Sequence, residues 1–181
     1  QQYDVDFETR NDVTIPEYLK MIEYKTAVLI GAAMKMGAIV AEASENCKVN
    51  TYEFGRNLGI AFQLQDDYLD CFGNPKTFGK KVGGDIITNK KTFLYLKTLQ
   101  KSNESDARVL KQLFSSFPED PSEKVQQVKE LYVKSGAAKE SLQEIIKYTQ
   151  NANSIIQELN ISDKNKAVLK SFSDQLMNRK V

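Results

Sequence analysis

Residues 62–73, FQLQDDYLDCFG, place three aspartates in a stretch that is otherwise largely apolar. Because successive residues of an α-helix turn by about 100° around its axis, Asp66, Asp67 and Asp70 fall on one face, together with Gln63. An ionised carboxylate in apolar surroundings has to be hydrated, paired or bound to a cation. We therefore interpret this face as a candidate cation site, the alternative being a solvated or capping role for the aspartates.

Helix signals extend in both directions from this stretch and predict an all-α chain. Thr14-Ile15-Pro16-Glu17 has the capping-box pattern with proline in the first turn. Start and stop residues of this kind predict four helices with both ends, over 14–46, 50–71, 86–101 and 122–135, with Asp85 as the cap of the third. They also predict helices that start within 102–106, after Gly136 and at Ser162. No alternating apolar pattern is long enough to indicate a sheet. We interpret residues 1–181 as one helical domain.

The composition excludes several kinds of chemistry. The chain has 25 basic and 24 acidic residues, so we predict no nucleic-acid partner and expect any phosphate recognition to be local. It has no histidine, which excludes histidine-based triads and metal ligands within this sequence. Cys47 and Cys71 are interpreted as reduced thiols of a cytoplasmic protein. The apolar segment 27–41 is interrupted by Lys35 and is shorter than the ~20 residues of a membrane span, so we predict none.

The residue types around the aspartates favour a hard cation that binds together with phosphate. Oxygen ligands suit Mg²⁺ ahead of Ca²⁺ or Mn²⁺, and Mg²⁺ commonly combines one or two carboxylates with water and substrate phosphates. The next segment, NPKTFGKKVGGD at 74–85, is a predicted loop with three glycines and three lysines. Lys80, Lys81 and Lys90 would supply positive charge to phosphate oxygens, the alternative being a solvated basic loop.

Lys25 is a second candidate for a phosphate-binding group. Its neighbours on the predicted helix are Met21, Val28 and Leu29, all of them apolar. A lysine in such surroundings either extends to the surface or faces a polar cavity. The adjacent Thr26 offers a hydroxyl that could bond to the lysine or to a phosphate.

Three segments together resemble the downstream part of the isoprenyl diphosphate synthases, the polyprenyl synthetase family. They are KTAVLIGAA at 25–33, GRNLGIAFQLQDDYLD at 55–70 and FGKKVGGDIITNKKT at 78–92. The resemblance implies the helical bundle of a class-I isoprenoid synthase, of which this chain would be the downstream half. It also implies a homodimer, with a deep cavity in which two aspartate-rich motifs face each other.

The resemblance assigns roles to the singled-out residues. Asp66, Asp67 and Asp70 would form the second aspartate-rich motif, with Asp66 as the most direct ligand of about three Mg²⁺ ions held with the diphosphate. Lys25, Lys80 and Lys90 would contact the allylic diphosphate. Thr26 and Gln63 would line the cavity next to the departing oxygen and the developing cation. Lys25, Gln63 and Asp66 would be the catalytic residues. Gln1 and Asp4 would belong to the cavity wall.

The implied reaction joins an allylic diphosphate to isopentenyl diphosphate through a carbocation, with loss of a proton. In the family, the first aspartate-rich motif and the isopentenyl diphosphate site precede these segments, and this sequence contains neither. We therefore expect a C-terminal portion whose N-terminal half is missing and which shows no turnover alone. The alternatives are a non-catalytic subunit of a heteromeric prenyl synthase, another class-I terpene enzyme, and a helical scaffold without activity.

Overall fold

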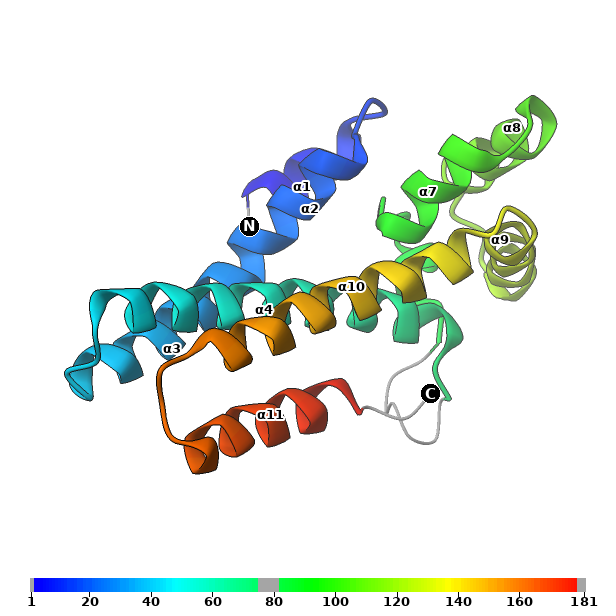
Figure 1. The fold of residues 1–181 in the computed structure, drawn as a ribbon. Helices are drawn as coiled ribbons and strands as arrows, with labels where there is room; N and C mark the ends of the chain where they lie inside the picture. The colour runs from blue at the N-terminus through cyan, green and yellow to red at the C-terminus, as the bar shows by residue number, and fades with distance from the viewer. Residues whose placement is uncertain (1, 75–81, 179–181) are drawn as a thin grey trace. The chain divides into compact units, whose positions relative to one another are not determined.

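The computed structural model describes residues 2–74 and 82–178, apart from the side chains of residues 2, 4, 5 and 8. Within these ranges every regular element is a helix, which confirms the all-α prediction (Figure 1). The helices are α1 Gln2–Thr9, α2 Ile15–Ile22, η1 Glu23–Ala27, α3 Val28–Val40, α4 Glu45–Phe72, α6 Gly84–Ile87, α7 Phe93–Lys101, α8 Glu104–Leu113, α9 Ser122–Lys134, α10 Ala137–Glu158 and α11 Asp163–Met177. No helix in the described ranges is both long and apolar enough to cross a membrane.

The chain divides into two compact units. One comprises the described residues of Gln1–Tyr18 and Asp66–Gln143, and we call it the aspartate unit because it carries the three aspartates of α4. The other comprises Leu19–Gln65 and the described residues of Glu144–Arg179, and we call it the lysine unit because it carries Lys25.

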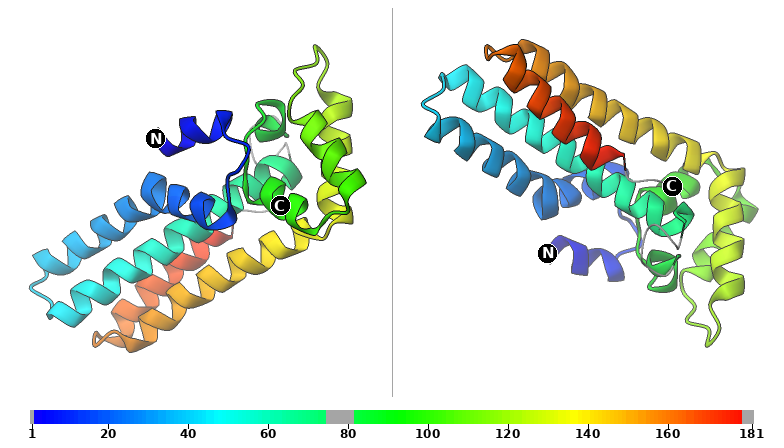
Figure 2. Two further views of the ribbon diagram at one scale, coloured as in Figure 1. Left: turned by 90° about the horizontal axis from the view of Figure 1, so that it is seen from above. Right: turned by 90° about the horizontal axis from the view of Figure 1, so that it is seen from below.

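The lysine unit is a bundle of α3, most of α4, and α10 and α11, whose helices lie side by side (Figure 2). Phe54 and Leu58 of α4 meet Ala152 and Ile156 of α10 in a core from which water is fully excluded. Leu169 and other partly buried apolar residues of α11 pack against this core. Burial of these apolar side chains is the main term that stabilises the unit.

Glycines let α4 approach η1 and α3 very closely. A Cβ atom added to Gly59 would lie 2.6 Å from Cα of Ala27, and one added to Gly55 would lie 2.9 Å from Cα of Gly31. Real Cβ atoms do not come this near to backbone atoms, so these glycines set the distance between the helices. The close contact brings the residues next to Ala27 within reach of side chains on α4.

The aspartate unit packs α7, α8 and α9 around buried aromatic and aliphatic side chains, among them Leu110, Val128 and Tyr132. One buried charge fixes its loop at 88–92. The Lys124 ammonium, only 3% exposed, donates to Oδ1 of Asn89 and to the carbonyl of Ser116. Burial lowers the pKa of Lys124.

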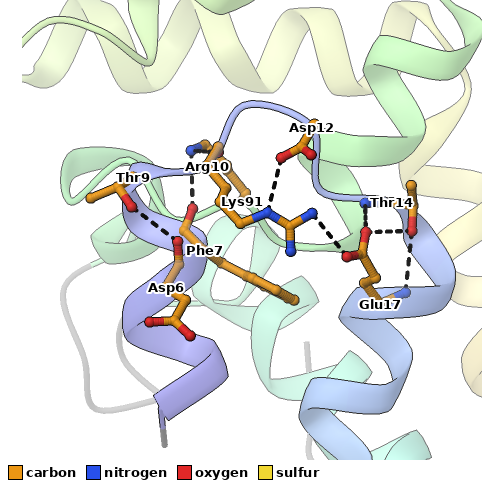
Figure 3. Close-up of polar contacts among 8 residues, drawn as sticks. All are labelled: Asp6, Phe7, Thr9, Arg10, Asp12, Thr14, Glu17 and Lys91. Atoms are coloured by element: carbon orange, nitrogen blue, oxygen red, sulfur yellow. Dashed lines mark hydrogen bonds and ion pairs between the residues drawn. The ribbon is translucent and has the colours of Figure 1, made fainter.

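The predicted capping box at the start of α2 is confirmed. The Thr14 N–H donates to Oε2 of Glu17 over 2.9 Å, and the Glu17 N–H donates back to the Thr14 hydroxyl over 3.4 Å (Figure 3). The Arg10 guanidinium lies 2.9 Å from Oε1 of the same glutamate. These bonds lower the pKa of Glu17, so the carboxylate stays charged as a cap.

Lys91 closes the end of α1. Its ammonium donates to the carbonyl of Phe7, in the last turn of the helix, over 3.0 Å, and to the carbonyl of Arg10, which directly follows the helix (Figure 3). A cation at a helix C-terminus satisfies carbonyls that have no partner in the helix and interacts favourably with its dipole. The helix α1 was not predicted from the sequence.

Three predicted helix boundaries are wrong. The helix predicted over 50–71 begins earlier, at Glu45. The helix predicted over 14–46 ends at Val40, because Glu42 adopts a left-handed conformation (φ 51°) and Ser44 starts α4 by accepting the Cys47 N–H. The helix predicted over 86–101 is interrupted after α6, since Asn89 has a φ of 59°. Asp85 lies inside α6 and does not cap it: the residue before α6 is Gly83.

Candidate active site

The three aspartates lie in the last turns of α4, where all three are half-buried. Leu64 and Leu69, from the same turns, are fully buried, so one side of the helix faces the core and another carries the carboxylates. This arrangement confirms that the segment is an amphipathic helix. The roles assigned to the individual aspartates stay predictions.

The Asp70 carboxylate is held by backbone from the 83–85 segment. Its Oδ2 accepts the Asp85 N–H over 2.9 Å, and the Asp70 carbonyl accepts the Gly83 N–H over 2.6 Å. A Cβ atom on Gly84 would lie 3.0 Å from Oδ1 of Asp70, so a small residue is needed at this position. Lys90, predicted to bind diphosphate, lies next to this group: its ammonium is 2.8 Å from Oδ1 of Asp85.

The Asp67 carboxylate is held by a residue that the sequence did not single out. The hydroxyl of Tyr18, from α2, donates to its Oδ2. No local signal identifies this pair, because the two residues are 49 positions apart and tyrosines are common in helical cores.

The lysine unit brings together the two residues predicted to lie next to the departing oxygen. The Thr26 hydroxyl donates to Oε1 of Gln63 over 3.2 Å. Gln63 lies one helical turn after Gly59, the position of closest approach to Ala27. The missing side chain at Gly59 is therefore what allows this hydrogen bond.

Lys25 and Thr26 lie in a five-residue π-helix, η1, inserted between α2 and α3. Single π-turns inside α-helices are uncommon and occur frequently at functional sites. The Arg56 guanidinium of α4 ties η1 to the bundle through Glu23, over 3.1 Å. The Lys25 side chain is exposed. Both predicted alternatives, extension to the surface and a place on the wall of a polar cavity, agree with this exposure.

Some predicted site residues lie outside the described part of the structure. They are Lys80 and Lys81, within residues 75–81, together with Gln1 and the side chain of Asp4. Their predicted roles therefore rest on the sequence.

The donor set on α4 fits a hard cation. Across residues 2–74 and 82–178, no three His, Cys, Asp or Glu side chains form a group that could by itself hold a metal ion. Mg²⁺ fits an incomplete carboxylate set, since it takes one or two carboxylates and fills its octahedron with water and phosphate oxygens. Burial raises the pKa of the neighbouring Cys71 to about 12, which disfavours its thiolate form.

The chain is all-α, and the aspartates at the end of α4 provide oxygen ligands suited to a hard cation. The model of the polyprenyl synthetase family matches residues 1–134. The chain therefore belongs to the polyprenyl synthetase family.

Individual relatives agree with this assignment. A short chain isoprenyl diphosphate synthase of Methanothermobacter thermautotrophicus is 42% identical over 119 residues, which cover 66% of this chain and 37% of the relative. A crystal structure of a geranylgeranyl pyrophosphate synthase is 51% identical, with a TM-score of 0.93 over 100% of this chain and 56% of that one. A geranylgeranyl pyrophosphate synthase of Corynebacterium glutamicum, complexed with isoprenyl diphosphate and magnesium, is 26% identical, with a TM-score of 0.90 over 99% and 51% of the two chains.

The chain is shorter than these relatives. It spans 37% of the curated relative from Methanothermobacter and 56% of the geranylgeranyl pyrophosphate synthase structure.

Proposed function

We propose that this chain is part of a prenyltransferase that joins an allylic diphosphate to isopentenyl diphosphate and forms a longer trans-prenyl diphosphate. The observation that carries the proposal is the aspartate-bearing end of α4, where Asp67 and Asp70 are each held in place by a protein donor. Fixed carboxylates are what a metal–diphosphate site requires. Family membership and the names of the relatives support the same reaction.

Mg²⁺ is the proposed metal, in the number of ions that the family resemblance implies. When bound, it would neutralise charge on the departing diphosphate. Asp66 would bind it most directly, and Asp67 and Asp70 would bind through water or orient it. The bound magnesium of the Corynebacterium relative supports this choice.

The chain's own residues would prepare the allylic diphosphate to leave. Lys25, Lys80 and Lys90 would bind its oxygens as point charges, and such fixed charges stabilise the oxyanion that develops as the carbon–oxygen bond breaks. Thr26 and Gln63 would lie next to this oxygen and to the carbocation, held in one orientation by their mutual hydrogen bond. The proton lost after attack by isopentenyl diphosphate would leave with the diphosphate.

The complete enzyme would need protein beyond these 181 residues. The first aspartate-rich motif and the isopentenyl diphosphate site would come from an N-terminal half, with Gln1 and Asp4 at the cavity wall. We also propose a homodimer in the cytoplasm. The apolar Leu29 and Val40 of α3, 73% and 84% exposed in this chain, are suited to burial against further protein, from the N-terminal half or a second subunit.

Turnover by the complete enzyme tests the proposed function. We expect it to extend dimethylallyl, geranyl or farnesyl diphosphate with isopentenyl diphosphate when Mg²⁺ is present, and to stop when the metal is chelated. Mass spectrometry of the prenyl products is the measurement. A folded complete protein that extends none of the three substrates would overturn the proposal and would favour a non-catalytic subunit.

Replacing Lys25 with alanine is expected to raise KM for the allylic diphosphate by about 10- to 100-fold, since one charge-assisted bond of about 1.5–3 kcal/mol is lost. Steady-state kinetics with a varied allylic substrate measure the effect. Lys35→Ala, which removes the same charge from the neighbouring α3, is the matched control and should leave KM unchanged. Equal kinetics for Lys25→Ala and wild type would favour a lysine that only extends to solvent.

A further inference from the structure

The Tyr18 hydroxyl points at the aspartate-rich motif from another helix. Tyr18 lies in α2 and is 1% exposed. Its hydroxyl donates to Oδ2 of Asp67, the second aspartate of the motif. Both residues belong to the aspartate unit, so this contact is part of its internal packing.

The phenol is a fixed donor in this position. Tyr18 is almost completely buried, so its side chain has little freedom to turn away from Asp67. The ring is set by packing, and its centroid lies 6.4 Å from that of Phe93 in a tilted arrangement. A rigid ring whose hydroxyl donates to Oδ2 gives the Asp67 carboxylate a preferred orientation.

Asp67 and Asp70 are therefore oriented by different means. Asp70 accepts a backbone N–H, whose position depends on the 83–85 segment, whereas Asp67 accepts a side-chain hydroxyl from α2. A carboxylate oxygen that accepts one hydrogen bond keeps further lone pairs, and the second oxygen is not used by this bond. The hydrogen bond thus fixes the carboxylate without removing its capacity to bind a cation or a metal-bound water.

We propose that Tyr18 is a positioning residue for the metal–diphosphate site, acting through Asp67. The inference rests on the proposed function, in which Asp67 serves Mg²⁺ through water. Groups that orient a metal-binding carboxylate typically change metal affinity or activity by about 10–100-fold when they are removed. A tyrosine that only fills the core would instead affect stability and leave the metal dependence unchanged.

The test is Tyr18→Phe in the complete enzyme, which keeps the ring against Phe93 and removes only the hydroxyl. We expect the Mg²⁺ concentration for half-maximal turnover to rise by about tenfold. Calorimetric titration with inorganic diphosphate at a fixed Mg²⁺ concentration should show a parallel loss of affinity. This second readout does not depend on turnover.

Tyr95→Phe is the matched control. Tyr95 is also buried in the aspartate unit, 6% exposed, with its ring centroid 4.3 Å from that of Phe114, and burial alone raises its pKa. The control should leave the Mg²⁺ dependence within twofold of wild type. If Tyr18→Phe behaves in the same way in both readouts, the positioning role is overturned.

Asp67→Asn provides a second background that separates a folding defect of Tyr18→Phe, which would persist there, from the positioning role. An amide oxygen still accepts the tyrosine hydrogen bond but carries no charge. Because Tyr18 is proposed to act through the Asp67 charge, adding Tyr18→Phe to Asp67→Asn should change the Mg²⁺ dependence less than twofold. A full tenfold further effect would contradict the proposal. The wild-type enzyme could show no prenyl transfer while Tyr18→Phe still weakens diphosphate binding in the calorimetric titration. That result would reject the proposed reaction and keep the positioning role.

Discussion

Replacement of Asp66 by alanine is expected to lower kcat of the complete enzyme by about 10³-fold while the protein stays folded. Asp66 is the proposed direct ligand, and a metal contributes several kcal/mol to charge stabilisation in a transition state. A loss of about 4 kcal/mol corresponds to three tenfold steps in rate. Because the aspartate is half-buried at the end of α4 and bears like-charged neighbours, its removal should cost little stability. Steady-state kinetics and circular dichroism measure the two effects.

Asp174→Ala is the matched control for this variant. Asp174 lies in α11, where it forms a surface ion pair with Lys170. Such pairs contribute about 0–1 kcal/mol to stability, and nothing assigns this residue to the chemistry. Its kcat should equal that of wild type. If Asp66→Ala also kept activity within a few-fold of wild type, the metal role of Asp66 would be wrong.

Gly59→Ala is expected to have the largest effect among substitutions outside the proposed binding residues. The added Cβ would lie 2.6 Å from Cα of Ala27, which is backbone and can yield only if η1 moves. Overpacking of this kind costs about 1–3 kcal/mol of stability. The movement would also separate Thr26 from Gln63, and a displacement of about 1 Å near the chemistry can lower the rate by about 10²-fold. Urea unfolding and kcat are the measurements.

Gly37→Ala makes the same chemical change in the same unit without the collision. No heavy atom lies within 4 Å of a Cβ added at Gly37, in α3. Alanine should stabilise the protein there by about 0.4–1 kcal/mol, because it reduces the freedom of the unfolded chain. Equal stability changes at the two glycines would refute the importance of the close approach.

Much of the fold could be predicted because its signals are local. The capping box of Thr14 and Glu17 and the cap at Ser162 act over three residues, so their partners are visible in the sequence. The aspartate face could be predicted for the same reason, since helical spacing alone brings its members together.

The remainder depends on partners far apart in the chain. The break between α6 and α7 depends on Asn89, whose side chain bonds to Lys124, 35 residues later. The π-helix at Lys25 has no recognised sequence signal, and the hydrogen bond from Tyr18 to Asp67 arises only when α2 packs beside α4 in the folded chain. Sequence patterns predicted which residues carry the chemistry but not which residues hold them.

Electron paramagnetic resonance of Mn²⁺ tests directly whether the end of α4 is a metal–diphosphate site. Carboxylate oxygens that suit Mg²⁺ also bind Mn²⁺, and its signal reports the free ion. We predict that the complete wild-type enzyme binds Mn²⁺ tightly only when inorganic diphosphate is present, and that Asp66→Asn weakens this binding by at least about tenfold. Diphosphate-dependent Mn²⁺ binding of equal strength in wild type and Asp66→Asn would contradict the assignment of the metal to this face of α4.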